Sequence, residues 1–254
     1  MTRNHNDEKF SKEYVPYSLH KNKLINLCKH IAQMNFHLLT QQKTRNLLDV
    51  TEDEWKQFQN SWDRLELDMF MKDGGTYRFR RHATFSAEPF APPKLEAAQP
   101  HYQSLDYNTL NGGIARCFSH LEESTLNNEA FLATLSLCAR IFGSLAPFYR
   151  WHIEAHQFRI YAQDDGASPT PEGIHQDGVC FVFMMLINRV NVLNGETRIY
   201  DLDKKILSSH TFTHPGEAAI VNDRHIMHGV TPILWVNPEL PGHRDMLVIT
   251  FRKN

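Results

Sequence analysis

The sequence predicts a mainly β protein, an antiparallel sandwich or barrel with helices packed outside it. Two observations carry this prediction: a helical first third of the chain, and a series of short strands after Pro147 that Gly, Asn, Asp and Pro turns separate. The 254 residues are enough for one large domain, and no internal repeat divides them. We therefore expect a single domain over residues 1–254, with a helical cover formed by residues 1–70.

The helical part is predicted over residues 20–70. Apolar residues from Leu24 to Ile31 follow the i, i+3, i+4, i+7 spacing of one helix face. Thr51 is expected as the N-cap of another helix, because the acidic residues after it favour the positive end of the helix dipole. The same apolar spacing predicts a later helix over residues 128–145.

Short strands are predicted at residues 153–162, 179–187, 197–201, 218–221 and 246–251. In the first of them, Gln157, Arg159 and Tyr161 alternate with apolar residues, so the three polar side chains share one face. The apolar run at residues 179–187 has about half the length of a membrane-spanning helix. We expect this run in the core.

Composition restricts the classes of function. The chain has 27 Lys and Arg against 29 Asp and Glu, a balance that argues against a nucleic-acid-binding protein. Residues 1–13 contain no apolar signal segment, and the four cysteines form no CxxC pair. We therefore expect a cytoplasmic protein with reduced thiols and no membrane association. The 15 histidines indicate metal or proton chemistry.

A metal-binding pattern precedes the apolar strand. His175 and Asp177 are two residues apart, so on a strand both side chains face the same ion. A third ligand is expected from residues 222–232, where we favour His228 and keep His225 as its rival. Two histidines and one carboxylate leave three positions of an octahedron open, which is the arrangement of the non-haem Fe(II) oxygenases.

Arg244 lies 16 residues after His228, at the start of the last predicted strand. A lone arginine in an otherwise apolar strand needs an anion, and its planar guanidinium suits a carboxylate. An oxygenase that uses 2-oxoglutarate would bind the distal carboxylate of that molecule here.

Taken in order, these residues resemble the Fe(II)/2-oxoglutarate dioxygenases. Within them, the chain is most similar to the bacterial hydroxylases of free L-amino acids, typified by L-isoleucine dioxygenase, a group that includes biofilm stress and motility proteins. Asn194-Gly195 departs from the Gly-Gly pair expected in this group. The resemblance covers residues 75–254 and rests on the motifs Gly75–Arg80, Tyr107–Phe118, His156–Arg159, His175-x-Asp177, His228–Pro232 and Arg244-Asp245.

The resemblance implies a fold, a reaction and a set of site residues. The fold would be a double-stranded β-helix, a cupin-like jelly roll, over residues 75–254. His175, Asp177 and His228 would be the catalytic metal ligands for Fe(II), and Arg244 would bind 2-oxoglutarate. The reaction would use O₂ to hydroxylate a C–H bond of a free L-amino acid or close derivative, releasing succinate and CO₂.

An amino-acid substrate needs an arginine for its carboxylate and acceptors for its ammonium group. We expect these from Gln157, Arg159 and Tyr161 on the polar strand face, and from Arg80 with Arg78. Each has a structural alternative: an ion pair for Arg159, a mutual contact for Gln157 and Tyr161, and a solvated charged face for the arginines at 78 and 80.

Two further histidines and the reaction class also admit more than one interpretation. His152 and His156 are four residues apart, as in a zinc-binding helix, but their segment alternates like a strand, so we favour packing or surface roles. A Zn²⁺-dependent hydrolase or isomerase on the same barrel is the alternative enzyme. A non-catalytic cupin-like stress or motility protein is the alternative outside enzymology. The sequence leaves the substrate and the oligomeric state open.

Overall fold

The computed structural model describes residues 18–170 and 172–254. Its helices are α2 (Ser18–Met34), α3 (Gln41–Leu48), α4 (Glu52–Asn60), α5 (Glu123–Leu126) and α6 (Glu129–Leu145), with the 3-10 helix η1 (Ser61–Arg64). Its strands are β1 (Phe36–Leu39), β2 (Glu66–Leu67), β3 (Arg78–Ala87), β4 (Lys94–Leu95), β5 (Trp151–Tyr161), β6 (Phe181–Val190), β7 (Val192–Asn194), β8 (Thr197–Tyr200), β9 (Ile206–His210), β10 (Ala218–Asn222), β11 (Met227–Val230), β12 (Ile233–Trp235) and β13 (His243–Lys253). The five strands and the helix at 128–145 that the sequence predicts are all present, with boundaries shifted by a few residues.

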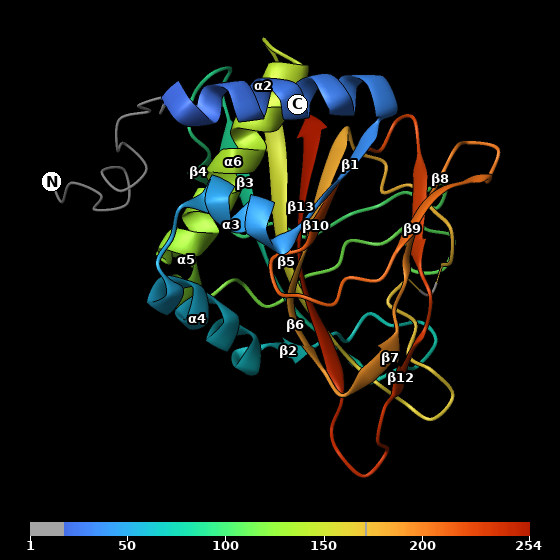
Figure 1. Ribbon diagram of the computed structural model, residues 1–254. Coiled ribbons are helices and arrows are strands. Elements are labelled where there is room, and N and C mark those ends of the chain that lie inside the picture. Colours follow the sequence, from blue (N-terminus) through green and yellow to red (C-terminus); the bar gives the residue numbers. More distant parts are fainter. Residues whose placement is uncertain (1–17, 171) are drawn as a thin grey trace, which may run out of the picture.

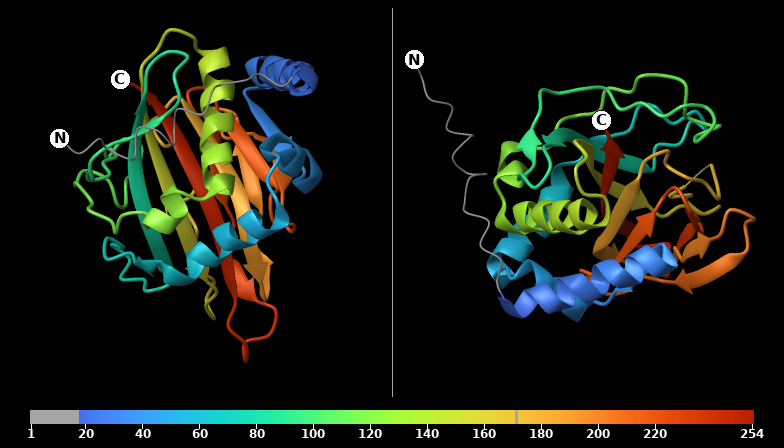
Figure 2. Two further views of the ribbon diagram at one scale, coloured as in Figure 1. Left: turned by 90° about the vertical axis from the view of Figure 1, so that its left-hand side faces the viewer. Right: turned by 90° about the horizontal axis from the view of Figure 1, so that it is seen from above.

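The strands form a jelly roll. The large antiparallel sheet has the order β1-β10-β6-β13-β5-β3-β2, with β4 paired to β3. Two small sheets, β11-β8-β9 and β12-β7, face one side of it, and the helices cover the other side (Figure 1). Figure 2 shows α6 lying along the sheet and α2 crossing at its end. The predicted mainly β fold class with outer helices is confirmed.

The alternation along β13 explains why the large sheet has two different faces. Leu247, Ile249 and Phe251 are fully buried in the layer between the sheet and the helices. Met246 and Val248 point the opposite way, into the space between the sheets. One strand therefore closes the main core and lines the cavity described below.

The helical cover is confirmed in part and corrected in part. Thr51 caps α4 as predicted: its Oγ1 accepts from the backbone N–H of Glu54, while the Glu54 carboxylate accepts from the backbone N–H of Thr51 at 2.8 Å. The region predicted as a helical cover also contains a strand, because β1 pairs with β10 and forms one edge of the large sheet. The first 17 residues of the predicted cover lie outside the described residues.

The long apolar run predicted for the core forms most of β6, where residues 181–187 are buried. In the described ranges, no helix is long and apolar enough to cross a membrane. All four cysteines are free thiols: Cys138 and Cys180 are buried, Cys28 is partly buried, and Cys117 is exposed.

Candidate metal centre and substrate cavity

A cavity of about 440 Å³ lies on the face of the large sheet opposite the helices. Alternate residues of β3, β5 and β13 form its floor, and residues 99–108 and 169–179 form much of its rim. This volume is in the range of small-molecule sites in proteins. The described residues contain two clusters of the residue types that bind metals. Both clusters contribute side chains to the cavity wall.

His175, Asp177 and His228 meet in this cavity although 51 residues separate the last two. The backbone joins them: His175 and His228 form a β-bridge in which each N–H donates to the other's carbonyl at 2.9 Å. Asp177 Oδ1 lies 3.4 Å from His175 Nε2, and its Oδ2 lies 3.6 Å from His228 Nε2. The structure thus brings together the three predicted ligands.

The hydrogen bonding of His175 suits a metal ligand. Its Nδ1 lies 3.0 Å from the carbonyl oxygen of Gly173, which accepts the Nδ1 hydrogen. That contact makes Nε2 the nitrogen that faces Asp177 and His228, where an ion would displace its proton. The residues present therefore fit a divalent ion with one open face.

The electrostatics of the three ligands describe the protein before metal binding. Burial alone would raise the pKa of Asp177, but the hydrogen bond from His175 and the nearby histidines lower it below its usual range. Burial would lower the pKa of His175, but Asp177 and Glu172 raise it to about 9. Burial lowers the pKa of His228 to about 4. At neutral pH a single proton, on His175, therefore occupies the place of the ion.

Asp223 holds the turn that carries Asp177 and was not singled out by the sequence analysis. Its carboxylate accepts the backbone N–H groups of Asp177, Gly178 and Val179 at 3.0, 2.9 and 3.0 Å. The side chain is 1% exposed. A short acidic residue directly after the buried strand β10 was the feature that could have indicated this role.

His225, the rival to His228, lies away from the cavity. It is exposed, and its backbone N–H donates to the carbonyl of Asn222 in the turn before β11. The turn directs His225 to solvent and leaves His228 on the inner face of β11. The geometry therefore supports His228, and not His225, as the third predicted ligand.

Arg244 enters the cavity from β13 and is 2% exposed. Its Nε and Nη2 are buried, and neither donates to any residue that the structure describes. Burial, aided by the positive charge of Arg189, lowers the pKa of Arg244 to about 9. A buried guanidinium with unused donors is expected to bind an anion from outside the chain.

The Asn194-Gly195 turn keeps space for Arg244. Both residues have left-handed φ, 59° and 71°, which Asn and Gly tolerate best among the residues. A Cβ atom at position 195 would lie 2.8 Å from Cγ2 of Ile233 and 3.4 Å from Cδ of Arg244. The departure from a Gly-Gly pair therefore preserves the turn, and Gly195 avoids a close contact with Ile233 next to Arg244.

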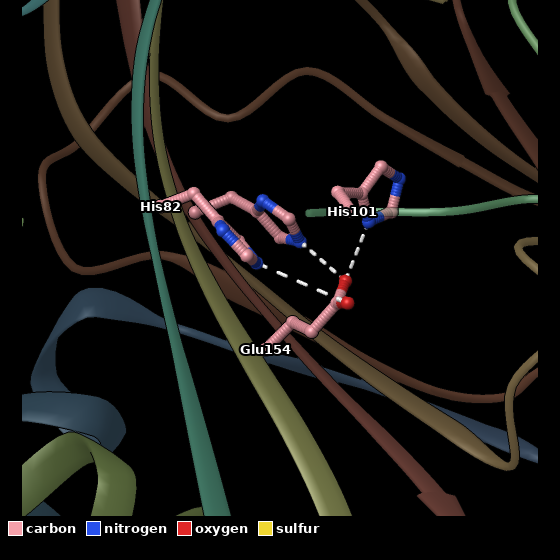
Figure 3. A group of neighbouring side chains, drawn as sticks. His82, His101 and Glu154 are labelled. Carbon is pink, nitrogen blue, oxygen red and sulfur yellow. Dashed lines mark hydrogen bonds and ion pairs between the residues drawn. The ribbon is translucent and has the colours of Figure 1, made fainter. Parts of the chain in front are cut away.

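A second cluster of histidines surrounds Glu154 in the same cavity (Figure 3). The Glu154 carboxylate lies 2.6 Å from His101 Nδ1, 3.2 Å from His156 Nε2 and 3.9 Å from His82 Nε2. Burial lowers the pKa of His82 to about 2 and that of His156 to about 3, so both rings are neutral. Burial would raise the pKa of Glu154, but hydrogen bonds from His101, His152 and His156 hold it well below its usual range.

This cluster was missed by the sequence analysis, which treated His152 and His156 as packing residues. They lie on β5, as the alternation predicted, and not on a helix. Position 154 lies between them in the i, i+2, i+4 pattern of one strand face, so Glu154 could have been recognised. His82 and His101 come from distant segments, and no local pattern connects them with β5.

Comparison with known proteins identifies the family. The model of the 2OG-Fe dioxygenase family matches residues 59–250. The chain belongs to this family. It is 26% identical over 207 residues to 3(1)-hydroxy-L-isoleucine 4-dioxygenase from Pantoea ananatis (strain AJ13355), covering 80% of this chain and 82% of that protein.

Two further relatives agree with this assignment. The dioxygenase is 26% identical over 165 residues to L-isoleucine-4-hydroxylase from Bacillus thuringiensis, covering 62% of this chain and 67% of that one. It is 33% identical to a bsmA homologue from Methylobium petroleophilum PM1, whose crystal structure superposes with a TM-score of 0.82 over 90% of this chain and 92% of that one. The predicted cofactors, Fe(II) and 2-oxoglutarate, are those of the family. Membership sets aside the hydrolase, isomerase and non-catalytic alternatives.

Three of the five predicted substrate residues of the dioxygenase lie outside the cavity. Gln157, Arg159 and Tyr161 share one face of β5 as expected, but it is the face opposite the cavity. Arg159 donates to Asp245 at 2.7 Å, and Gln157 donates to Ser61 Oγ at 2.7 Å. Tyr161 packs among aromatic rings. The expected substrate contacts are therefore wrong for these three residues, because the polar face of β5 is satisfied within the protein.

Arg80 and Arg78 do line the cavity, and the interpretation as a solvated charged face is wrong for both. Arg78 forms an ion pair with Asp68 at 2.8 Å. The Arg80 guanidinium lies between two aromatic rings, 3.5 Å from the centroid of Phe118 and 4.4 Å from that of Phe158. A substrate contact of Arg80 stays a prediction.

Proposed function

We propose that this dioxygenase hydroxylates a C–H bond of a free L-amino acid or a close derivative, converting 2-oxoglutarate and O₂ to succinate and CO₂. The observation that carries the proposal is a buried arginine with unused donors in the same cavity as two histidines and a carboxylate. The amino-acid substrate is suggested by the two curated relatives, whose names specify isoleucine or hydroxyisoleucine.

In this proposal the two ends of the cavity have separate tasks. His175, Asp177 and His228 hold Fe(II), with Asp223 fixing the turn that carries Asp177. Arg244 forms a charge-assisted pair with the distal carboxylate of 2-oxoglutarate, which satisfies its buried donors. Bound together, Fe(II) and 2-oxoglutarate supply the activation of O₂ that C–H hydroxylation requires.

The rest of the cavity suits a small substrate. Met184, Met246, Val248 and Val179 contribute apolar surface that an aliphatic side chain would cover. The cavity volume of about 440 Å³ leaves no room for a folded partner. We further propose a cytoplasmic location, which the free thiols support.

The test is succinate release by purified protein with Fe(II), ascorbate and 2-oxoglutarate, measured with each of the twenty amino acids. We expect succinate formation to depend on one amino acid or a few related ones, with a product heavier by one oxygen atom. The Asp177→Ala variant is the matched control and should give neither. Succinate that no amino acid increases, from protein that binds iron and 2-oxoglutarate, would reject the free-amino-acid substrate.

A further inference from the structure

Residues 101–116 contribute to the cavity wall, and the inference depends on three of them, His101, Gln103 and Arg116. His101 and Arg116 form an antiparallel bridge in which each backbone N–H donates to the other's carbonyl at 2.9 Å. Residues directly opposite in such a pair project on the same side. His101 and Gln103 are two residues apart, so they share that side, and all three residues line the cavity.

Arg116 is a second buried guanidinium without a carboxylate partner. It is 2% exposed, and its Nε is buried without an acceptor. The neighbouring arginines differ: both Arg78 and Arg80 lie within ion-pair distance of Asp68. In the described part of the chain, Arg116 donates from Nη2 to Oε1 of Gln103 at 3.0 Å. Its Nε therefore remains a buried donor without an acceptor, as Nε of Arg244 does at the other end of the cavity.

Gln103 connects Arg116 with the metal centre. Its Oε1 accepts from both Asn108 Nδ2 at 3.1 Å and Arg116 Nη2 at 3.0 Å, which fixes the orientation of the amide. Its Nε2 then faces Asp177, at 3.3 Å from the backbone carbonyl and 3.4 Å from Oδ1. An anion bound to Arg116 would thus be linked through the Gln103 side chain to Asp177, a predicted metal ligand.

A free carboxylate oxygen faces the same space. Glu172 lines the cavity, with Oε1 3.5 Å from His175 Nε2 and with Oε2 buried without a hydrogen bond from any described residue. Glu172 and Arg116 interact electrostatically but form no ion pair in the described part of the chain. Glu154, in contrast, is already surrounded by histidine donors. A guanidinium and a carboxylate therefore face one cavity, and each has a buried polar atom, Arg116 Nε and Glu172 Oε2, without a hydrogen-bond partner among the described residues. Together they complement a ligand that carries both charges.

We propose that Arg116 binds the α-carboxylate of the amino-acid substrate and that Glu172 accepts from its α-ammonium group. This inference rests on the proposed function and deepens it, because it restricts the substrate to α-amino acids with both groups free. It replaces the predicted roles of Gln157, Arg159 and Tyr161, which lie on the other face of β5.

The test compares L-isoleucine with two analogues that each lack one charge. 2-Methylbutylamine has no carboxylate, and 2-hydroxy-3-methylpentanoate has no ammonium group. Binding is measured by calorimetry without O₂, on protein loaded with Fe(II) and 2-oxoglutarate. If another amino acid gives the higher turnover, its own amine and hydroxy acid replace these. The variants are Arg116→Gln, Arg116→Lys and Glu172→Gln, with Arg150→Gln as the control for an exposed arginine (70% side-chain exposure).

We expect Arg116→Gln to weaken L-isoleucine binding by about 30-fold or more, and to weaken the amine by less than about threefold, because the amine makes no contact that this variant removes. Arg116→Lys should recover part of the loss. Glu172→Gln should show the mirror pattern, weakening L-isoleucine but not the hydroxy acid. The affinity for 2-oxoglutarate should stay unchanged in the Arg116 variants.

Three other outcomes are distinguishable. If Arg116→Gln weakens L-isoleucine and the amine equally, the arginine has only a structural role and the inference is overturned. If the variants bind L-isoleucine as the unaltered protein does, the inference is also overturned, while the proposed function stands. If the unaltered protein binds 2-oxoglutarate but none of the twenty amino acids, the free-amino-acid substrate of the proposed function is rejected and this inference fails with it.

Discussion

Two groups of histidines and a carboxylate lie in one cavity, and their surroundings differ. His175, Asp177 and His228 have ligand atoms within 4.8 Å of one another, and so have the side chains around Glu154. In the first group, Nδ1 of His175 donates to a backbone carbonyl, so Nε2 is the nitrogen that would bind an ion once its proton is displaced. Residue types and distances alone would not distinguish the two groups.

The second group is closed by its neighbours. Nδ1 of His156 lies 2.7 Å from Nη2 of Arg80. A guanidinium can only donate, so Nδ1 accepts and the ring hydrogen is on Nε2, where it donates to Glu154. That hydrogen occupies the position an ion would need. The comparison teaches that the partner of Nδ1 decides the role of Nε2: a carbonyl behind His175 suits a metal ligand, whereas the guanidinium behind His156 suits an internal hydrogen-bond network.

The sharpest way to break this comparison is to remove one carboxylate from each group. Asp177→Ala should abolish Fe(II) binding and turnover, because the remaining two histidines no longer form a three-point site. Glu154→Gln should keep about one Fe(II) per chain, and should lower the free energy of unfolding by roughly 1–3 kcal/mol through lost charged hydrogen bonds. Metal analysis after gel filtration measures the bound iron, and chemical denaturation measures the free energy of unfolding. Loss of iron in the Glu154 variant would contradict the assignment.

The second prediction tests the arginine that completes the metal end. Arg244→Ala should raise the dissociation constant of 2-oxoglutarate by about 30-fold or more, because a desolvated carboxylate loses its charged partner. Gly195→Ala should raise it less, since the new methyl group crowds Ile233 and Arg244 without removing the charge. Calorimetric titration of 2-oxoglutarate measures both. An unchanged constant in Arg244→Ala would move the anion site elsewhere.

Metal affinity should depend on pH through His175. Its pKa of about 9 means that the metal-free protein carries one proton there at neutral pH, whereas His228, with a pKa of about 4, carries none. An ion displaces that proton, so the affinity for Co(II) should rise by about tenfold per pH unit below pH 9. Calorimetry in buffers of different ionisation enthalpy counts the released proton. Glu154→Gln should release the same number, and release of none would contradict the assigned protonation.

The smallest effect is expected at the rival histidine. His225→Ala should change metal affinity and stability by less than about 0.5 kcal/mol, because the side chain is exposed and outside the cavity. His228→Ala is the matched comparison and should lose the metal. Cobalt titration of the two variants would sharpen the choice, and equal losses would show that the ligand was assigned to the wrong residue.

Local pattern was enough to predict much of the fold. The period of 2 in residues 153–162 predicted β5 and the shared face of its polar residues, and the period of 3.6 in residues 128–145 predicted α6. The pair His175 and Asp177 follows from the same alternation, because i and i+2 on a strand face one way whatever the fold.

The sequence by itself thus determined the elements, the metal-ligand spacing and the family resemblance, since all of these depend on neighbours along the chain. Only the tertiary structure decided which face of β5 borders the cavity. Asp245 and Ser61, both distant in sequence, satisfy Arg159 and Gln157, and this pairing turns the other face of the strand, with Glu154, toward the substrate space. Contacts between residues far apart in the chain leave no periodic pattern. For that reason, the contacts that Asp223 and Arg116 make became visible only once the chain was folded.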